Sequence, residues 1–237
     1  MPRTDPPVEG TLRARPRAEL ADTDVVREAG ELTLGLSADR DGLLYVPNRY
    51  TPQRRAPLLV LFHGAGGNAR HALAPFVRDA DRCGVILLAP ESRERSTWDV
   101  IDSGTLGPDV AFVDRALEVV FARYAVDPDR IAVGGFSDGA SYALTLGLLH
   151  GDLFRKVLAF SPGFSAASRI VGRPRIFVAH GTRDEVLPIE HCSRRVVPSL
   201  RRAGLDVEYR EFEGPHVVPP ELVRVAFDEH LCSAADA

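Results

Sequence analysis

Ser137 stands in the pentapeptide GFSDG, residues 135–139, between an apolar run and a run of small residues. Glycine two residues before and after a serine permits a sharp turn from a strand into a helix, because neither glycine has a side chain that would collide there. Such a turn holds the hydroxyl outward as a nucleophile. The pattern GxSxG also arises by chance in roughly one chain of this length in ten, so the rest of the chain must support the assignment.

A serine hydroxyl is a weak nucleophile at neutral pH, so this chemistry needs a histidine base and an acid that orients it. When the serine lies on a strand-to-helix turn, the acid and then the histidine follow on loops after later strands. Asp184 follows the apolar run 175–180 and precedes a proline-led helical stretch. His216 follows the strand-like run 207–212 and precedes the last helical stretch. We therefore predict Asp184 as the acid and His216 as the base.

Four further residues could fill these two roles instead. His63 and His180 each end a strand-like run before a glycine, but their order in the chain disfavours both as the base. Glu185 and Glu213 could replace the acid, although neither stands at the strand end as well as Asp184 does. The remaining histidines lie within or beside helical patterns and are assigned no role: His71, His150, His191 and His230.

The glycine-rich segment 61–69, LFHGAGGNA, follows a strand-like run and has backbone amides that could converge on a developing oxyanion. We predict the amide of Ala65 as one donor and the amide of Asp138, next to the nucleophile, as the other. Loss of one such donor typically costs about 2.7 to 4 kcal/mol of transition-state stabilisation. The segment also resembles part of a dinucleotide-binding turn, with Glu91 as a ribose ligand. A nucleotide site would leave the later serine, aspartate and histidine unexplained.

Short, continuously apolar runs must position these residues. Such runs are typical of strands covered on both faces, and they lie at 57–62, 85–90, 130–135, 156–160 and 175–180. Helical patterns alternate with them, notably over 109–124, which predicts a mostly parallel sheet with right-handed crossovers and helices on both faces. Two earlier runs, 31–36 and 42–47, predict an antiparallel hairpin before this sheet.

Length, composition and net charge indicate the class of protein and its number of domains. With 237 residues, of which 45% are apolar, the chain can bury a full core. We predict a flexible or loosely docked N-terminal arm over 1–30 and a single catalytic domain over 31–237. The net charge of -4 argues against a nucleic-acid binder, which usually has a basic face.

No apolar signal-peptide core precedes Ala18, and no later run approaches 18 apolar residues, so we expect a cytoplasmic location and no stable membrane insertion. Three cysteines lie far apart without CxxC spacing: Cys83, Cys192 and Cys232. This pattern indicates neither a disulfide framework nor a zinc site, and predicts three reduced thiols.

From about Asp41 to Leu231 the chain resembles the α/β-hydrolase superfamily, particularly small phospholipase/carboxylesterase proteins and polyhydroxybutyrate depolymerase-like esterases. The matching segments are FHGAGG at 62–67, VDPDRIAVGGFSDGA at 126–140, HGTRDEVLP at 180–188 and GPHVVPPE at 214–221. The resemblance implies an α/β-hydrolase fold and the roles already given for Ser137, Asp184, His216, Ala65 and Asp138. Acyl-protein thioesterases of this group usually carry Gln after the nucleophile, and Asp138 departs from that pattern.

We expect a serine carboxylic ester hydrolase that forms an acyl-enzyme on small-molecule esters and requires no metal or organic cofactor. The span between Pro162 and Pro174 leaves no room for a large cap domain, so we expect an open groove for short to medium acyl chains. Candidate groove walls are Trp98, Leu106, Phe136, Phe164, Leu187 and Val217. A thioesterase, lysophospholipase or peptidase with the same triad, and a catalytically silent binding fold, are the competing functions. A homodimer through an edge strand or exposed helix is an open alternative to a monomer.

Overall fold

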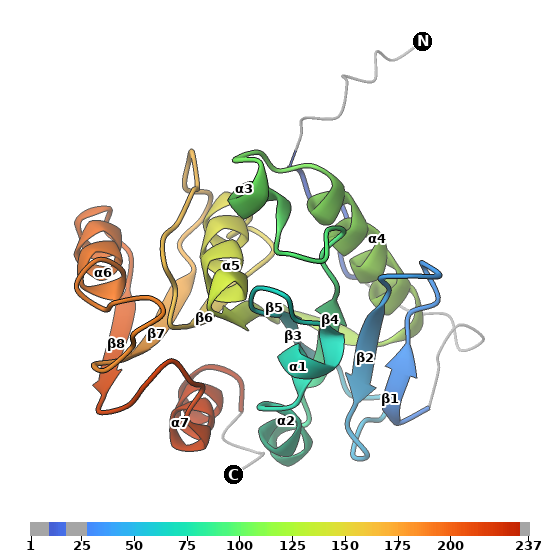
Figure 1. The fold of residues 1–237 in the computed structure, drawn as a ribbon. Helices are drawn as coiled ribbons and strands as arrows, with labels where there is room; N and C mark the ends of the chain where they lie inside the picture. The colour runs from blue at the N-terminus through green and yellow to red at the C-terminus, as the bar shows by residue number, and fades with distance from the viewer. Residues whose placement is uncertain (1–9, 18–27, 233–237) are drawn as a thin grey trace.

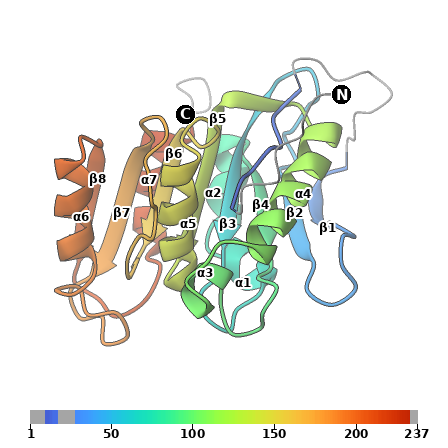
Figure 2. The same cartoon turned by 90° about the horizontal axis from the view of Figure 1, so that it is seen from above.

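One eight-stranded sheet runs through the computed structural model, which describes residues 10–17 and 28–232. Its strand order is β1-β2-β4-β3-β5-β6-β7-β8 (Figures 1 and 2). The strands are β1 (Gly30–Thr33), β2 (Gly42–Val46), β3 (Ala56–Phe62), β4 (Ile86–Pro90), β5 (Val126–Phe136), β6 (Lys156–Phe160), β7 (Arg175–Gly181) and β8 (Val207–Phe212). The pairs β1–β2 and β2–β4 are antiparallel and the other five are parallel. The predicted mostly parallel sheet with an antiparallel start is confirmed.

Helices cover both faces of this sheet, as predicted. They are α1 (Ala69–Leu73), α2 (Val77–Cys83), α3 (Asp99–Asp102), α4 (Pro108–Arg123), α5 (Asp138–Leu149), α6 (Ser193–Arg202) and α7 (Pro220–His230). Residues of α4, α5 and α6 share one hydrophobic cluster and residues of α1, α2 and α7 share another. In Figure 1 these two sets of helices lie above and below the sheet.

Strand β3 shows why continuous apolarity is needed in the middle of the sheet. All seven of its residues are buried. Leu58, Val60 and Phe62 point into the cluster under α4 and α5, whereas Leu59 and Leu61 point into the cluster under α1 and α2. Because successive side chains of a strand alternate between faces, a strand covered on both sides must be apolar at every position.

Residues 10–17 belong to the arm expected over 1–30, and they pack against α4. Leu12 and Ala14 are buried. The backbone amides of Arg13 and Ala14 both donate to Oδ1 of Asp114, at 2.7 and 2.8 Å. The buried side chains of Leu12 and Ala14 and the carboxylate of Asp114 therefore hold this segment against α4. The rest of the expected arm, 1–9 and 18–27, lies outside the described residues.

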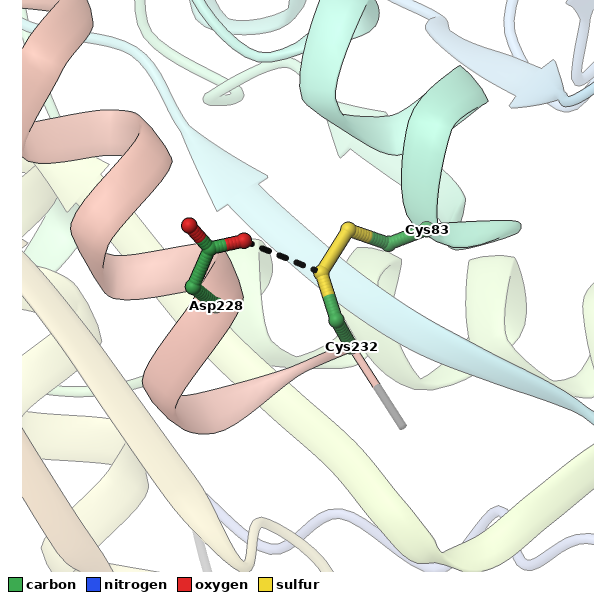
Figure 3. A group of neighbouring side chains, drawn as sticks. All are labelled: Cys83, Asp228 and Cys232. Atoms are coloured by element: carbon green, nitrogen blue, oxygen red, sulfur yellow. Dashed lines mark hydrogen bonds between the residues drawn. A yellow bond between two sulfur atoms is a disulfide. The ribbon is translucent and has the colours of Figure 1, made fainter. Parts of the chain in front are cut away.

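The prediction of three reduced cysteines is wrong for two of them. Cys83, at the end of α2, and Cys232, just after α7, form a disulfide across a sequence separation of 149 residues (Figure 3). Their Cα atoms lie 4.9 Å apart, within the usual range for a disulfide. Spacing rules miss the pair because α2 and α7 become neighbours only when they pack on the same face of the sheet. Cys192 is a buried free thiol.

The segment between β6 and β7, residues 161–174, contains no helix. The predicted absence of a large cap is therefore confirmed at this place. Over the described ranges, no helix has both the length and the apolarity to cross a bilayer.

Candidate active site

Ser137 lies at the sharp turn between β5 and α5, with φ 59° and ψ -123°. Positive φ is strained for a residue with a side chain. The flanking glycines make this turn sterically possible, because a Cβ on Gly139 would lie 2.1 Å from the Phe62 carbonyl oxygen. A Cβ on Gly135 would lie 2.5 Å from the backbone of Gly139. The backbone therefore closes tightly around the serine.

The structure brings Ser137, His216 and Asp184 together from the loops after β5, β8 and β7. Nε2 of His216 lies 2.9 Å from Oγ of Ser137, and its Nδ1 lies 2.6 Å from Oδ2 of Asp184. These strands are parallel, so their carboxyl ends meet at one edge of the sheet. A neutral imidazole with its proton on Nδ1 donates to the carboxylate and accepts from the serine hydroxyl. This arrangement can transfer the hydroxyl proton to His216.

The Asp184 carboxylate is held by its own loop and has no exposed surface. Its Oδ1 accepts hydrogen bonds from the amides of Val186 and Leu187, at 3.0 and 2.8 Å. Burial raises the pKa of Asp184, but hydrogen bonds from His216 and from the Leu187 amide outweigh it, so the pKa lies below its usual value. The carboxylate is therefore ionised at neutral pH.

His180 lies behind this acid and makes no contact with Ser137. Its Nε2 donates to the Leu187 carbonyl at 2.8 Å and lies 3.2 Å from Oδ2 of Asp184. Its Nδ1 accepts from the Ser193 hydroxyl at 2.6 Å. His180 thus supports the loop that carries Asp184. The sequence shows only that His180 ends a strand before a glycine, and a histidine base could stand at such a position too.

None of His63, Glu185 and Glu213, which the sequence also allows as base or acid, is hydrogen-bonded to Ser137 or His216. The imidazole of His63 is buried and bonds the Gly64 carbonyl at 2.8 Å. Glu185 is exposed, and Glu213 is paired with Arg183 at 3.5 Å near the surface.

The two predicted oxyanion donors flank the nucleophile. A Cβ on Gly64 would lie 3.3 Å from Cβ of Ser137, so the backbone before Ala65 passes directly beside the serine. Ala65 is exposed, and the loop is closed by hydrogen bonds from its neighbours, including Gly67 N–H to the Gly64 carbonyl at 3.0 Å. Asp138 is the first residue of α5, where amide N–H groups have no acceptor within the helix. That these two amides bind an oxyanion stays a prediction.

Sequence reasoning missed a contact that holds Asp138. The hydroxyl of Thr97 donates to Oδ2 of Asp138 at 2.5 Å, which joins the loop after β4 to the start of α5. No spacing rule links two residues that lie 41 positions apart in a loop and a turn.

The predicted groove walls divide into two groups. The ring of Phe136 lies beside the His216 ring, with centroids 4.5 Å apart and planes tilted by 37°. Phe164 and Val217 are partly exposed apolar side chains. The side chain of Leu187 lies 3.7 Å from where a Cβ on Gly163 would stand. Trp98, in contrast, is fully buried and stacked on Tyr142, with its indole N–H donating to the His63 carbonyl at 2.8 Å. Trp98 is therefore a core residue, and Leu106 packs against the same core cluster beside Gly10.

An open pocket of about 490 Å³ adjoins His216 on the side of the acid loop. Its lining residues are Arg183, Glu185, Val186, Pro215 and His216. The sequence predicts only apolar walls and gives no sign of these charged residues. Exposed charged residues in a loop look the same in the sequence whether they line a pocket or a solvated surface.

Two groups of potential metal ligands occur among the described residues, and neither adjoins Ser137. One comprises Asp228 and the disulfide-bonded pair Cys83 and Cys232. The other comprises Glu208, Glu229 and His230, where Arg210 lies 2.7 and 3.6 Å from the two carboxylates. A guanidinium thus already supplies the positive charge there.

The chain is similar to known esterases in both sequence and structure. It is 30% identical over 160 residues to the bifunctional acetylxylan esterase/xylanase XynS20E of Neocallimastix patriciarum. The matched residues are 63% of this chain and 22% of that protein. It is 28% identical over 159 residues to feruloyl esterase C of Emericella nidulans, covering 64% of this chain and 57% of that protein. The chain thus spans less than two thirds of these relatives.

Solved structures share the fold. Esterase PE8 superposes with a TM-score of 0.65 at 21% identity, covering 80% of this chain and 98% of its own. The CE1 ferulic acid esterase AmCE1/Fae1A of Anaeromyces mucronatus superposes with a TM-score of 0.61 at 17% identity, covering 90% and 96%. The Esterase family model matches residues 35–197, more than half of the chain. The chain shares the α/β-hydrolase fold with these esterases and belongs to the Esterase family.

Proposed function

We propose that the protein is a serine carboxylic ester hydrolase in which Ser137, His216 and Asp184 act as a catalytic triad. The observation that carries this proposal is the unbroken hydrogen-bond chain from Oγ of Ser137 through His216 to Oδ2 of Asp184, at 2.9 and 2.6 Å. A nucleophile bonded to a base that is itself oriented by a buried acid is the arrangement that such chemistry requires.

In the proposed mechanism, Ser137 Oγ attacks the ester carbonyl carbon while His216 Nε2 takes the hydroxyl proton. Asp184 stabilises the imidazolium that forms. The carbonyl oxygen becomes an oxyanion, which accepts hydrogen bonds from the amides of Ala65 and Asp138. The carbon–oxygen bond to the alcohol then breaks, and His216 gives its proton to the departing alcohol. Water, deprotonated by His216, then attacks the acyl carbon. The bond from that carbon to Oγ of Ser137 breaks, His216 returns the proton to Ser137, and the acid is released.

Short to medium acyl esters fit this site. The segment 161–174 offers no helix to enclose a long chain. The pocket beside His216 has Arg183 and Glu185 in its wall, which suits a polar rather than an aliphatic group. Two relatives are named acetylxylan esterase and feruloyl esterase, so acyl groups from acetyl to an aryl-propenoyl group form the test range.

The test is hydrolysis of p-nitrophenyl esters of increasing acyl length and of a feruloyl ester, with Ser137→Ala as the matched blank. A Ser137-dependent signal that is largest for short acyl groups supports the proposal. A fluorophosphonate probe run in parallel labels an activated serine whatever the substrate. Labelling without ester turnover would move the assignment to a thioesterase or peptidase, and folded protein that neither labels nor turns over ester would indicate a silent binding fold.

A further inference from the structure

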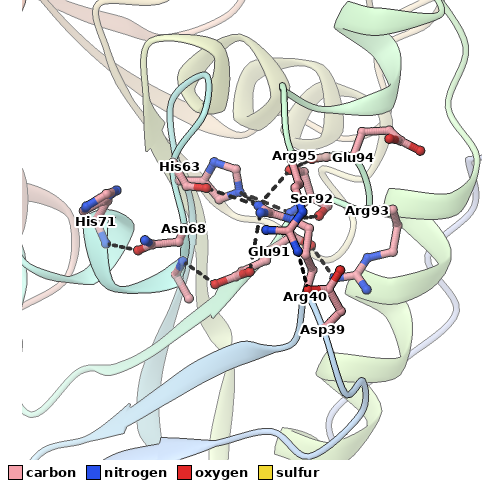
Figure 4. Close-up of polar contacts among 12 residues, drawn as sticks. Asp39, Arg40, His63, Asn68, His71, Glu91, Ser92, Arg93, Glu94 and Arg95 are labelled. Atoms are coloured by element: carbon pink, nitrogen blue, oxygen red, sulfur yellow. Dashed lines mark hydrogen bonds and ion pairs between the residues drawn. The ribbon is translucent and has the colours of Figure 1, made fainter.

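The loop that carries Ala65 rests on a buried polar cluster formed by Arg40, His63, Glu91 and Ser92 (Figure 4). Arg40 comes from the turn between β1 and β2, and it is only 7% exposed. A buried guanidinium is costly unless its donors are satisfied. The donors of Arg40 contact the loop itself, or Glu91 and Ser92, which in turn bond the loop. Arg40 is therefore buried where it can hold the loop in place.

The contacts of Arg40 reach the C-terminal end of the loop, at Gly67 directly and at Ala69 through Glu91. Its Nη2 donates to the carbonyl of Gly67 at 3.1 Å and to the hydroxyl of Ser92 at 3.2 Å. Its Nε donates to the carbonyl of Ser92. Its Nη1 lies 3.8 Å from Oε2 of Glu91, whose Oε1 accepts from the amide of Ala69 at 3.2 Å.

Arg40 and the Ser92 amide together determine which nitrogen of His63 carries the proton. Nε2 of His63 lies 3.2 Å from Nη2 of Arg40 and 3.1 Å from the amide nitrogen of Ser92. Both partners are donors only, so Nε2 must be the unprotonated acceptor. Nδ1 lies 2.8 Å from the Gly64 carbonyl oxygen, an acceptor, so Nδ1 carries the hydrogen. Burial lowers the pKa of His63 to about 4 against the opposing bond to Gly64, and the charge of Arg40 lowers it further.

The hydrogen bond from His63 sets the direction of the oxyanion donor. The Gly64 carbonyl and the Ala65 N–H belong to one planar peptide, and the described chain has no cis peptide bond. In a trans peptide the C=O and N–H groups point in opposite directions. The Gly64 oxygen is fixed by Nδ1–H of His63 and by the Gly67 amide at 3.0 Å. A fixed carbonyl therefore fixes the direction of the Ala65 N–H.

We propose that Arg40 is a positioning residue for the oxyanion hole: with the Ser92 amide it holds His63 in the Nδ1-protonated form, and His63 in turn aims the amide of Ala65. The kinetic consequence rests on the proposed function. The tautomer of His63 does not, and it can be measured without any substrate.

The first test compares Arg40→Met with Arg95→Met. Arg95 is the matched control, because its side chain is 74% exposed and pairs at 2.6 Å with Asp39, the neighbour of Arg40 in the same turn. With active sites counted by fluorophosphonate titration, Arg40→Met should lower kcat by up to about 100-fold, the effect of a misplaced catalytic group, and change KM less than about twofold. Arg95→Met should stay within about twofold in both. A normal kcat per titrated site in Arg40→Met would overturn the proposal.

The second test reads the tautomer by nitrogen-15 NMR of the imidazole of His63. Wild-type protein should show a proton on Nδ1 and none on Nε2. Arg40→Met should raise the share of the Nε2-protonated form, because only the Ser92 amide then opposes it. A wild-type signal with the proton on Nε2 would overturn the proposal, even if the protein hydrolysed no ester.

A third comparison keeps the proposal testable if Arg40→Met fails to fold. His63→Asn places an amide near the position of Nδ1 and can still donate to Gly64, whereas His63→Gln places its amide near Nε2. His63→Asn should therefore retain the higher kcat. Equal or reversed losses would contradict an orienting role for the Nδ1 hydrogen bond.

Discussion

Nδ1 of His216 lies 2.6 Å from Oδ2 of Asp184, and the carboxylate of that pair has no exposed surface. Hydrogen bonds between charged or polarised groups at this distance are among the stronger ones in proteins. Because two loop amides hold the other oxygen of Asp184, the acid cannot turn away from the imidazole without breaking both. The orientation of His216 thus depends on the backbone of the acid loop.

Asp184→Asn should lower kcat by about 10⁴-fold, because the amide favours the wrong tautomer of His216 and cannot stabilise the imidazolium. Steady-state kinetics on p-nitrophenyl acetate measures this loss. Glu213, whose side chain is 82% exposed, provides the control, and Glu213→Gln should leave kcat nearly unchanged. A greater loss in Glu213→Gln than in Asp184→Asn would move the acid to Glu213.

The buried carboxyl of Asp109 should make stability depend on pH. It accepts hydrogen bonds from the amides of Arg93 and Asp99, and burial raises its pKa to about 6. Between about pH 4 and 6 the folded protein keeps a proton that the unfolded chain has lost, so this contribution is full below pH 4 and is lost as the pH rises through 6. The free energy of unfolding should therefore fall by on the order of 2–3 kcal/mol across that window because of Asp109.

Urea unfolding at a series of pH values, in wild type and in Asp109→Asn, isolates that effect. The difference between the two proteins should change across the window, since the amide does not titrate. Asp102→Asn, at an exposed carboxyl on α3, serves as the comparison and should follow the wild-type curve. A pH-independent difference between wild type and Asp109→Asn would contradict the prediction.

Trp98→Phe and Phe164→Ala should separate a core residue from a groove residue. Loss of the indole hydrogen bond to the buried His63 carbonyl leaves that oxygen unsatisfied, which typically costs about 1–3 kcal/mol of unfolding free energy. The acyl-length preference of Trp98→Phe should stay as in wild type. Phe164→Ala should change that preference with little effect on stability, since Phe164 is 37% exposed. The opposite pattern would return Trp98 to the groove wall.

The disulfide between Cys83 and Cys232 predicts one free thiol in natively purified protein, with Cys192 reacting only after denaturation. Disulfides persist in oxidising compartments and are rare in the cytosol, so the same thiol titration also tests the cytoplasmic location expected from the sequence. A count of three free thiols would contradict the disulfide. In oxidised protein, Cys232→Ser should lower the free energy of unfolding by about 2–5 kcal/mol. Reductant should then have no further effect on the variant.

The sequence was informative wherever a residue is tied to a repeating pattern. Ser137, Asp184 and His216 each follow a strand-like run. Parallel strands end at the same edge of a sheet, and the structure brings the three residues together there. The apolar runs can be recognised in the sequence because a strand such as β3 is buried on both faces. Every position in such a strand is apolar.

Contacts between separate loops carry no such pattern. Arg40 stands in a turn of polar residues, and nothing in its neighbourhood along the chain indicates that its side chain is buried under the loop after β3. The pairing of Cys83 with Cys232 likewise depends on which two helices share a face of the sheet. Both features arise from tertiary packing, which spacing along the chain does not encode.

The bond between Cys83 and Cys232 makes the chain between them a covalent ring. Ser137, Asp184 and His216 all lie inside this ring, whereas the loop that carries Ala65 lies outside it. A protease that cuts the ring once, for example within residues 165–172, would therefore leave a single covalent molecule. Its two pieces would separate only after reduction, so the mass difference between reducing and non-reducing conditions would reveal where such a nick has occurred.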